Sequence, residues 1–166
     1  DGQYQLKAIA MALEQLEDLP LTVMMDAPQV KNNGGADHLV YLAQRFPNMS
    51  FVIRRIMYPS MPFMVEAMYQ AKNIYAECSW FHTRNAITMF SRHFGADRIL
   101  FSLGKKGNGG AAMAAVTFAD ITEEEKDMIR WGNFKRLFPE ATVKAIDNQV
   151  KNSYWTPFVE AGKVPD

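Results

Sequence analysis

The feature that most constrains this fold is a short apolar run that occurs four times, with enough chain between occurrences for a helix. The four runs are marked by Leu21, Phe51, Ile74 and Ile99. Their spacings of 30, 23 and 25 residues each leave room for a strand, a helix and two loops. Strands that are joined through helices pair in parallel. The sequence therefore predicts an α/β fold of repeated βα units over residues 1–139, followed by a C-terminal helix and tail over residues 140–166.

The expected strands are short and apolar, as is typical of strands buried on both faces. We place them at Leu21–Met25, Ser50–Arg55, Ile74–Cys78 and Ile99–Phe101. Apolar periodicity and capping signals predict helices over Tyr4–Leu16, Asp37–Phe46, Phe63–Ala71, Asn85–Phe94, Ala111–Ala119 and Thr122–Gly132. Asp37 is expected to cap the second helix after a flexible loop at 32–35. Thr83 or Asn85 is expected to cap the fourth helix, and Gly95 to stop it.

Composition excludes several classes of partner. The 166 residues are 48% hydrophobic, enough for one domain with a sizeable core. Eighteen basic and eighteen acidic residues give no net charge, so neither nucleic acid nor a membrane surface is expected as a partner. The single cysteine, Cys78, favours a cytoplasmic protein without disulfides. The chain opens Asp-Gly-Gln, from which we expect a processed or truncated start and no signal peptide.

Two polar segments come directly after the third and fourth expected strands, at residues 79–84 and 104–110. Ligands of parallel α/β proteins bind at this end of the strands. The second segment is rich in glycine and lysine, a combination that suits an anion although it is no Walker loop. We therefore expect a small anionic ligand at a mouth formed by Arg55, His82, Arg84, Lys105, Lys106 and Asn108.

Three residues are weak catalytic candidates: His82, Asp26 and Glu77. His82 follows a strand on the expected active face, and histidine is the side chain most often used there as a general acid or base. It has no cysteine, serine or carboxylate at a diagnostic spacing, so no mechanism follows from it. Glu77 lies within a strand, where a structural hydrogen bond or salt bridge is the simpler role. The catalytic residues of the chain, if it has any, stay unknown at this level.

Five segments together carry a resemblance to a known family. They are Pro20–Val23, Phe46–Ile53, Asn73–Ser79, Phe94–Phe101 and Trp131–Phe138. In this order they resemble the second half of an amidohydrolase-related barrel of amidohydrolase family 2. That family has a TIM-like (β/α)8 barrel and consists of metal-dependent hydrolases and decarboxylases. The resemblance implies that the four strands correspond to strands five to eight of such a barrel.

The resemblance also implies where metal ligands belong, and this chain departs from the pattern there. The histidine expected after strand five is replaced by Met25, or by Asp26 in a register one residue later. The histidine expected after strand six is replaced by Arg55, and the aspartate expected after strand eight by Gly104. The histidine pair of strand one lies outside the chain. A hydrolytic metal needs several fixed donors, so no metal site and no cofactor are expected here.

Three hypotheses remain open. The chain is an amidohydrolase-like subunit with a binding or assembly role. Or it is part of an active hydrolase or decarboxylase whose zinc or manganese site is completed by other ligands outside this chain. Or it is an enzyme that uses Asp26, Glu77 and His82 in an unfamiliar arrangement. Four barrel strands leave open edges and an uncovered inner face. We therefore expect self-association, or a partner chain that completes the barrel, over an inner face with the candidates Val23, Phe51, Ile53, Ile74, Tyr75 and Leu100.

Overall fold

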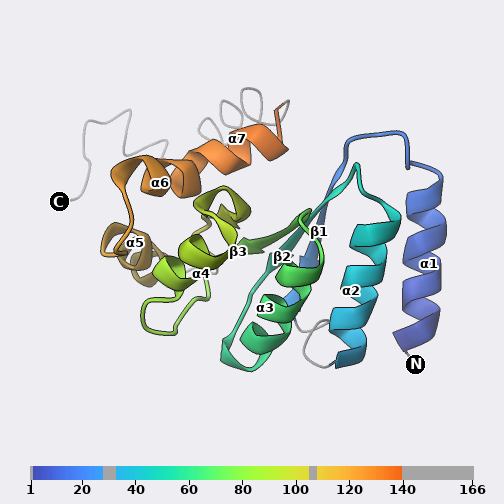
Figure 1. The fold of residues 1–166 in the computed structure, drawn as a ribbon, viewed down its shortest axis with the longest axis horizontal. Coiled ribbons are helices and arrows are strands. Elements are labelled where there is room, and N and C mark those ends of the chain that lie inside the picture. Colours follow the sequence, from blue (N-terminus) through green and yellow to red (C-terminus); the bar gives the residue numbers. More distant parts are fainter. Residues whose placement is uncertain (1, 28–32, 105–107, 140–166) are drawn as a thin grey trace, which may run out of the picture.

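A computed structural model of the chain describes residues 2–27, 33–104 and 108–139. It is an α/β fold around a four-stranded, all-parallel sheet with the strand order β1-β2-β3-β4 (Figure 1). The strands are β1 (Thr22–Asp26), β2 (Ser50–Arg54), β3 (Ile74–Glu77) and β4 (Ile99–Leu100). The prediction of a parallel α/β fold is confirmed, and each strand lies within about two residues of its expected place. The C-terminal helix and tail expected over 140–166 fall outside the described residues.

A helix follows or precedes every strand. The helices are α1 (Gly2–Glu14), α2 (Asn33–Arg45), α3 (Met61–Gln70), α4 (Ala86–Phe94), α5 (Gly109–Thr117), α6 (Glu123–Asp127) and α7 (Asn133–Leu137), with 3-10 turns η2 (Tyr58–Ser60) and η3 (Ala96–Arg98). A π-helical turn, η4 (Met128–Gly132), joins α6 to α7 without a break. Figure 1 shows α1, α2 and α3 side by side on one flank of the sheet, and α4 to α7 grouped at the other.

Three expectations about helix ends are wrong. Asp37 lies inside α2, because that helix begins at Asn33 and takes in the glycines that were expected to form a loop. Asn85 precedes α4 with a φ of 57° and makes no side-chain capping bond; the first turn is closed instead by the Ala86 amide, which donates to the Thr83 carbonyl at 3.2 Å. Gly132 keeps helical angles, and the helix continues to Leu137. Since Gly132 costs a helix only about 1 kcal/mol, packing against β4 outweighs it.

The core lies between the sheet and the helices. Alternate strand residues, among them Phe51, Ile53, Ile74 and Ile99, belong to one buried cluster with side chains of the helices. The intervening residues point to the opposite face. Of the six side chains expected on an inner face, Tyr75 and Leu100 lie on that opposite face. The other four were misassigned, because Val23, Phe51, Ile53 and Ile74 all face the helix-side core.

One buried arginine ties two βα units together. Arg98 is 9% exposed, and its guanidinium donates to the carbonyls of Met68, Ala71 and Ile74 at 2.7–3.1 Å. These carbonyls lie at the end of α3 and the start of β3, where a helix leaves backbone acceptors unpaired. Burial lowers the pKa of Arg98.

The outer edge of β4 is closed by the helix that runs through η4. The Cys78 amide donates to Leu100, so the Ile99 carbonyl and the Phe101 amide point away from β3. Asn133 donates to the Ile99 carbonyl at 2.7 Å, and the Phe101 amide donates to the Ile129 carbonyl at 3.0 Å. These groups would otherwise be available to a further strand.

The same helix continues across the inner face of the sheet. The Thr22 hydroxyl, at the start of β1, donates to the Leu137 carbonyl at 2.8 Å. The Arg136 guanidinium lies over the Tyr75 ring at 5.6 Å. Helix α7 therefore covers the N-terminal end of the inner face from β4 to β1, and the C-terminal end of the strands is left for a site.

Candidate functional site

A pocket of about 290 Å³ lies at the C-terminal ends of the strands, where parallel α/β proteins bind their ligands. We call it the mouth pocket. Every strand contributes to it, either with its last residue or with the residues just after it. Its lining is Asp26, Arg54, Arg55, Glu77, Ser79, Trp80, Ser102 and Gly104.

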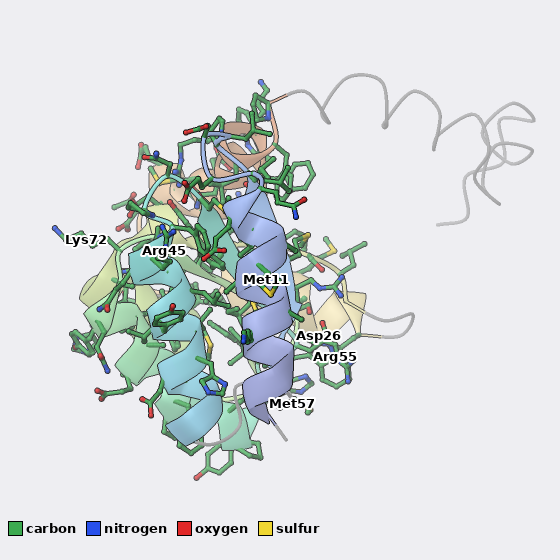
Figure 2. The ribbon with its side chains drawn as sticks, turned by 90° about the vertical axis from the view of Figure 1, so that its right-hand side faces the viewer. Met11, Asp26, Arg45, Arg55, Met57 and Lys72 are labelled. Carbon is green, nitrogen blue, oxygen red and sulfur yellow. The ribbon has the colours of Figure 1, made fainter. Side chains whose placement is uncertain are left out.

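Asp26 holds two arginines at one side of this pocket. Its Oδ1 accepts from Arg54 at 3.0 Å and its Oδ2 accepts from Arg55 at 3.2 Å. Figure 2 shows Asp26 and Arg55 close together. The register of the sheet explains the pairing, because Asp26 and Arg54 are direct neighbours at the ends of β1 and β2. The side chains of Arg54 and Arg55 are 47% and 40% exposed, and each guanidinium has more N–H groups than its one bond to Asp26 uses.

Glu77 organises the backbone of the mouth pocket. Its carboxylate is buried at 3% exposure and accepts from the Ser79 amide at 2.6 Å and the Ser79 hydroxyl at 3.0 Å. It also accepts from the Arg55 amide at 3.4 Å. Arg55 has a φ of 58°, a conformation that is rare for a residue with a side chain. The carboxylate thus helps to hold Arg55 in the strained turn that presents its guanidinium to Asp26.

Trp80 offers a hydrogen-bond donor that the described residues leave unused. Its indole Nε1 is buried and has no hydrogen-bond partner there. Gly104 passes close by with a φ of 66°, and a Cβ at that position would lie 3.3 Å from Nε1 and 2.9 Å from the Ser79 hydroxyl. A buried indole N–H without an acceptor costs free energy, so such groups often face a water molecule or a ligand.

Donors outnumber free acceptors in the mouth pocket. Both carboxylates that line it already accept hydrogen bonds on both of their oxygens. Trp80 Nε1 and the remaining guanidinium N–H groups of Arg54 and Arg55 have no acceptor among the described residues. A ligand that fits this arrangement supplies oxygen acceptors with negative charge, as a carboxylate, phosphate or sulfate does.

The structure separates the predicted site residues into three groups. Asp26, Arg55 and Glu77 meet in the mouth pocket. His82 and Arg84 line a different groove, of about 230 Å³, between the segment after β3 and α5. The Trp80 and His82 rings are in contact, with centroids 5.4 Å apart, so His82 is a neighbour of the mouth pocket and not part of its lining.

The remaining predicted ligand-binding residues are on the 104–110 segment. Asn108 donates to the Ser79 carbonyl at 2.7 Å, which fastens this segment to the turn after β3. Lys105 and Lys106 lie outside the described residues. The expected excess of positive charge in the mouth is therefore absent from the described lining, where two arginines balance two carboxylates.

The sequence reasoning did not place Ser79, Ser102 or Arg54 firmly in the site. All three follow from register: residues that end neighbouring parallel strands meet at one edge. Cys78, which precedes Ser79, is buried at 1% exposure. Burial, with a smaller contribution from the charge of Glu77, raises the pKa of its thiol to about 12. No reactive thiolate is therefore available beside the mouth pocket near neutral pH.

The described residues do not fit a catalytic divalent metal. Within 2–27, 33–104 and 108–139, no three side chains of His, Cys, Asp or Glu lie close enough together to bind one. The two carboxylates of the mouth pocket are engaged by arginines and by backbone donors, and a cation would meet Arg54 and Arg55 there.

Comparisons with protein-family models, with curated proteins and with solved structures found no match to this chain. Among the helices that the structure describes, none is long and apolar enough to cross a membrane.

Proposed function

We propose that the chain is a binding subunit of amidohydrolase-like, half-barrel architecture that takes a small oxyanion in the mouth pocket. On this proposal the four parallel strands correspond to strands five to eight of a (β/α)8 barrel. The metal ligands of such barrels are replaced by a cluster in which Asp26 orients two arginines and Glu77 fixes the backbone around them. The chain then binds a carboxylate, phosphate or sulfate without carrying out metal-dependent hydrolysis.

The observation that carries this proposal is the unpaired Nε1 of Trp80 beside two arginines whose carboxylate partner is already shared. Bound oxyanions are held by several charge-assisted hydrogen bonds at once. Each such bond contributes about 1.5–3 kcal/mol, and a neutral donor about 1 kcal/mol. The pocket of about 290 Å³ admits a small acid and not an extended polymer.

The test is a titration of the full chain with phosphate, sulfate and acetate, followed by amide and indole NMR. We expect the Trp80 indole resonance to shift on binding. Arg55→Gln should weaken binding at least tenfold, since it removes a charged donor. Trp80→Phe should weaken it about fivefold while keeping the ring.

Matched controls come from outside the mouth pocket. Arg92→Gln removes a cation that pairs with Asp120 on the surface, and Trp131→Phe removes an exposed indole N–H. Both variants should bind the anion as the original chain does. Equal weakening in the controls, or no anion-dependent shift at Trp80, would overturn the proposal.

The alternative is that the chain belongs to an active metal-dependent hydrolase or decarboxylase, with Asp26 as one metal ligand and the other ligands outside this chain. Elemental analysis of the purified protein separates the two. Near-stoichiometric zinc or manganese that is lost in Asp26→Asn would favour the enzyme and refute the binding subunit.

A further inference from the structure

The groove of about 230 Å³ between the segment after β3 and helix α5 has no part in the proposed function. We call it the α5 groove. Its α4 side includes three buried apolar residues, Phe81, Ala86 and Ile87. Its α5 side is formed by Ala114, Ala115, Phe118 and Ala119. The rest of the lining is polar, namely His82, Thr83, Arg84, Asn85 and Thr88. The α5 groove therefore combines an apolar surface with polar side chains.

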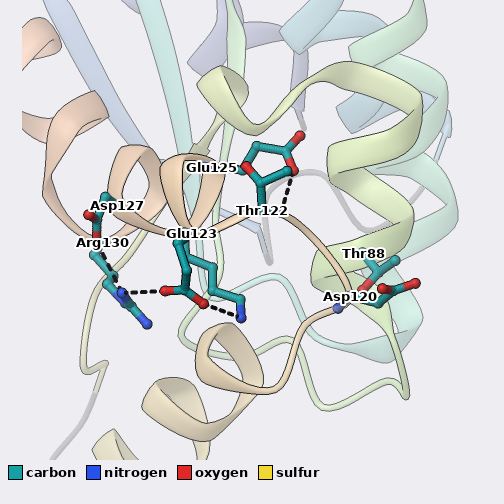
Figure 3. A network of polar contacts seen from close by, with 8 residues as sticks. Thr88, Asp120, Thr122, Glu123, Glu125, Asp127 and Arg130 are labelled. Atoms are coloured by element: carbon teal, nitrogen blue, oxygen red, sulfur yellow. Dashed lines mark hydrogen bonds and ion pairs between the residues drawn. The ribbon is translucent and has the colours of Figure 1, made fainter.

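The two walls of the α5 groove are held together at both ends of α5. Before the helix, the Asn108 side chain donates to the Ser79 carbonyl at 2.7 Å. After the helix, the Asp120 amide donates to the Thr88 hydroxyl of α4 at 3.0 Å (Figure 3). These bonds fix α5 relative to the segment after β3, so the groove is formed before any ligand arrives, as small-molecule sites usually are.

The charge of the α5 groove has one sign. Arg84 is the charged side chain among the described residues of the lining, and its guanidinium has no acceptor among them. The ring nitrogens of His82 likewise have no partner in the described part of the chain. Helix α5 contains no charged residue, and Asp120 just after it is paired with Arg92. The groove thus offers hydrogen-bond donors and positive charge without a carboxylate, which favours an anionic ligand group.

From these observations we propose that the α5 groove binds a small aromatic monocarboxylate, with its carboxylate on Arg84 and its ring against the apolar wall of α5. A guanidinium matches the planar geometry of a carboxylate with two parallel N–H groups. A cavity of about 150 Å³ is enough for benzene, so about 230 Å³ takes one ring and a carboxylate. A polymer does not fit this volume.

An aromatic ring suits the α5 groove better than an aliphatic chain does. Phe118 is 85% exposed, so its ring is available to a ligand in the groove that it lines. Aromatic rings attract one another in offset and edge-to-face arrangements, beyond the effect of the apolar area that they bury. The α5 groove and the mouth pocket share no lining residue, so this site does not depend on oxyanion binding at the mouth.

The test is an NMR titration of the full chain with benzoate, acetate and benzyl alcohol, read at the amides of Ala114 and Ala115. Benzoate should bind there at least tenfold more tightly than acetate, which lacks the ring, or benzyl alcohol, which lacks the charge. Arg84→Gln should weaken benzoate binding at least tenfold, since it removes a charge-assisted hydrogen bond. Ala114→Leu fills the groove and should abolish binding there.

Matched controls lie outside the α5 groove. Arg45→Gln changes a half-exposed arginine on α2, and Ala111→Leu enlarges an exposed alanine of α5 that is not part of the lining. Both variants should bind benzoate as the original chain does, and circular dichroism checks that every variant is folded. Phosphate binding at the mouth pocket should be unchanged in Ala114→Leu.

Three results would overturn the proposal. The first is equal affinity for benzoate and acetate at Ala114 and Ala115. The second is benzoate binding that survives both Arg84→Gln and Ala114→Leu. The third is a set of benzoate-dependent shifts that is confined to the Trp80 indole and lost in Arg55→Gln, because benzoate would then occupy the mouth pocket. This third result would support the proposed function while it refutes the second site.

Discussion

The two ends of the sheet use polar side chains in opposite ways. At the N-terminal end, Asn133 is 1% exposed and both of its amide hydrogens go to backbone carbonyls, those of Ala96 and Ile99. At the C-terminal end, Arg54 and Arg55 are 47% and 40% exposed and pair with the same carboxylate. A polar group that is fully satisfied by backbone stabilises the fold, whereas groups with donors to spare are available for a ligand.

The largest expected effect is a loss of stability when Asn133, at the closed edge of β4, is replaced. Asn133→Ala removes two hydrogen bonds and leaves the Ile99 carbonyl without a donor, although the Ala96 carbonyl still accepts from the Ile99 amide. It should lower the free energy of unfolding by about 3 kcal/mol. Urea denaturation measures this, with the exposed Asn48→Ala as the control. Oxyanion binding at the mouth pocket should be unchanged in the folded variant. A loss of less than about 1 kcal/mol would mean that Asn133 does not anchor the helix.

A smaller effect is expected where Gly104 passes Trp80. Gly104→Ala forces a side chain into a backbone with φ of 66° and sets its Cβ 2.9 Å from the Ser79 hydroxyl. We expect a loss of about 2 kcal/mol in the free energy of unfolding together with weaker oxyanion binding. Gly110→Ala is the control, because nothing lies within 4 Å of the added Cβ. Equal behaviour of the two variants would contradict the described mouth geometry.

The buried thiol beside the mouth pocket gives a pH signature. The pKa of Cys78 rises from 9.0 to about 12 in the folded chain. Below pH 9 the thiol is protonated in both states; above it, only the unfolded state ionises, so stability falls as pH rises towards 12. The extra loss is about 1.4 kcal/mol per pH unit relative to Cys78→Ala. Parallel pH profiles for the two proteins would show that Cys78 ionises freely in the folded state.

The smallest loss of stability is expected at the hydrogen bond that joins Thr22 of β1 to the end of α7. Thr22→Val keeps the shape of the side chain but removes the donor to the Leu137 carbonyl, which should cost about 1 kcal/mol. Thermal denaturation measures it, with Thr117→Val on the exposed end of α5 as the control. If Thr22→Val is neutral while Asn133→Ala is not, the helix is held from the β4 side alone.

The sequence was sufficient for the part of the fold that depends on local patterns. Four apolar runs at regular spacing predicted the parallel sheet. The helix start expected at Thr122 is also found, with Thr122 and Glu125 forming a capping box. Helix starts were less predictable, since the Asn33–Gly35 segment has turn residues yet begins α2. There, burial of the following Leu39 and Leu42 outweighs local preference.

The candidate site was predictable where strand ends supply it. Asp26, Arg55 and Glu77 were named from the sequence because they end or follow strands, and they meet in one pocket. His82 does not line that pocket, because its side chain continues past Trp80 towards α5. The position of α7 across the inner face of the sheet could not be predicted from the sequence. It depends on Asn133 reaching carbonyls more than thirty residues away, which no local pattern encodes.

Arg98 has a consequence for the order in which the chain folds. Its guanidinium supplies hydrogen-bond donors to backbone carbonyls at the end of α3 and the start of β3. Arg98 lies 24 to 30 residues after these carbonyls in the sequence. Until β4 docks, those carbonyls remain hydrated and the third βα unit lacks its final bonds. The third and fourth units should therefore gain protection from amide hydrogen exchange together, as one cooperative unit, and Arg98→Met should uncouple their exchange while α1 and α2 keep theirs.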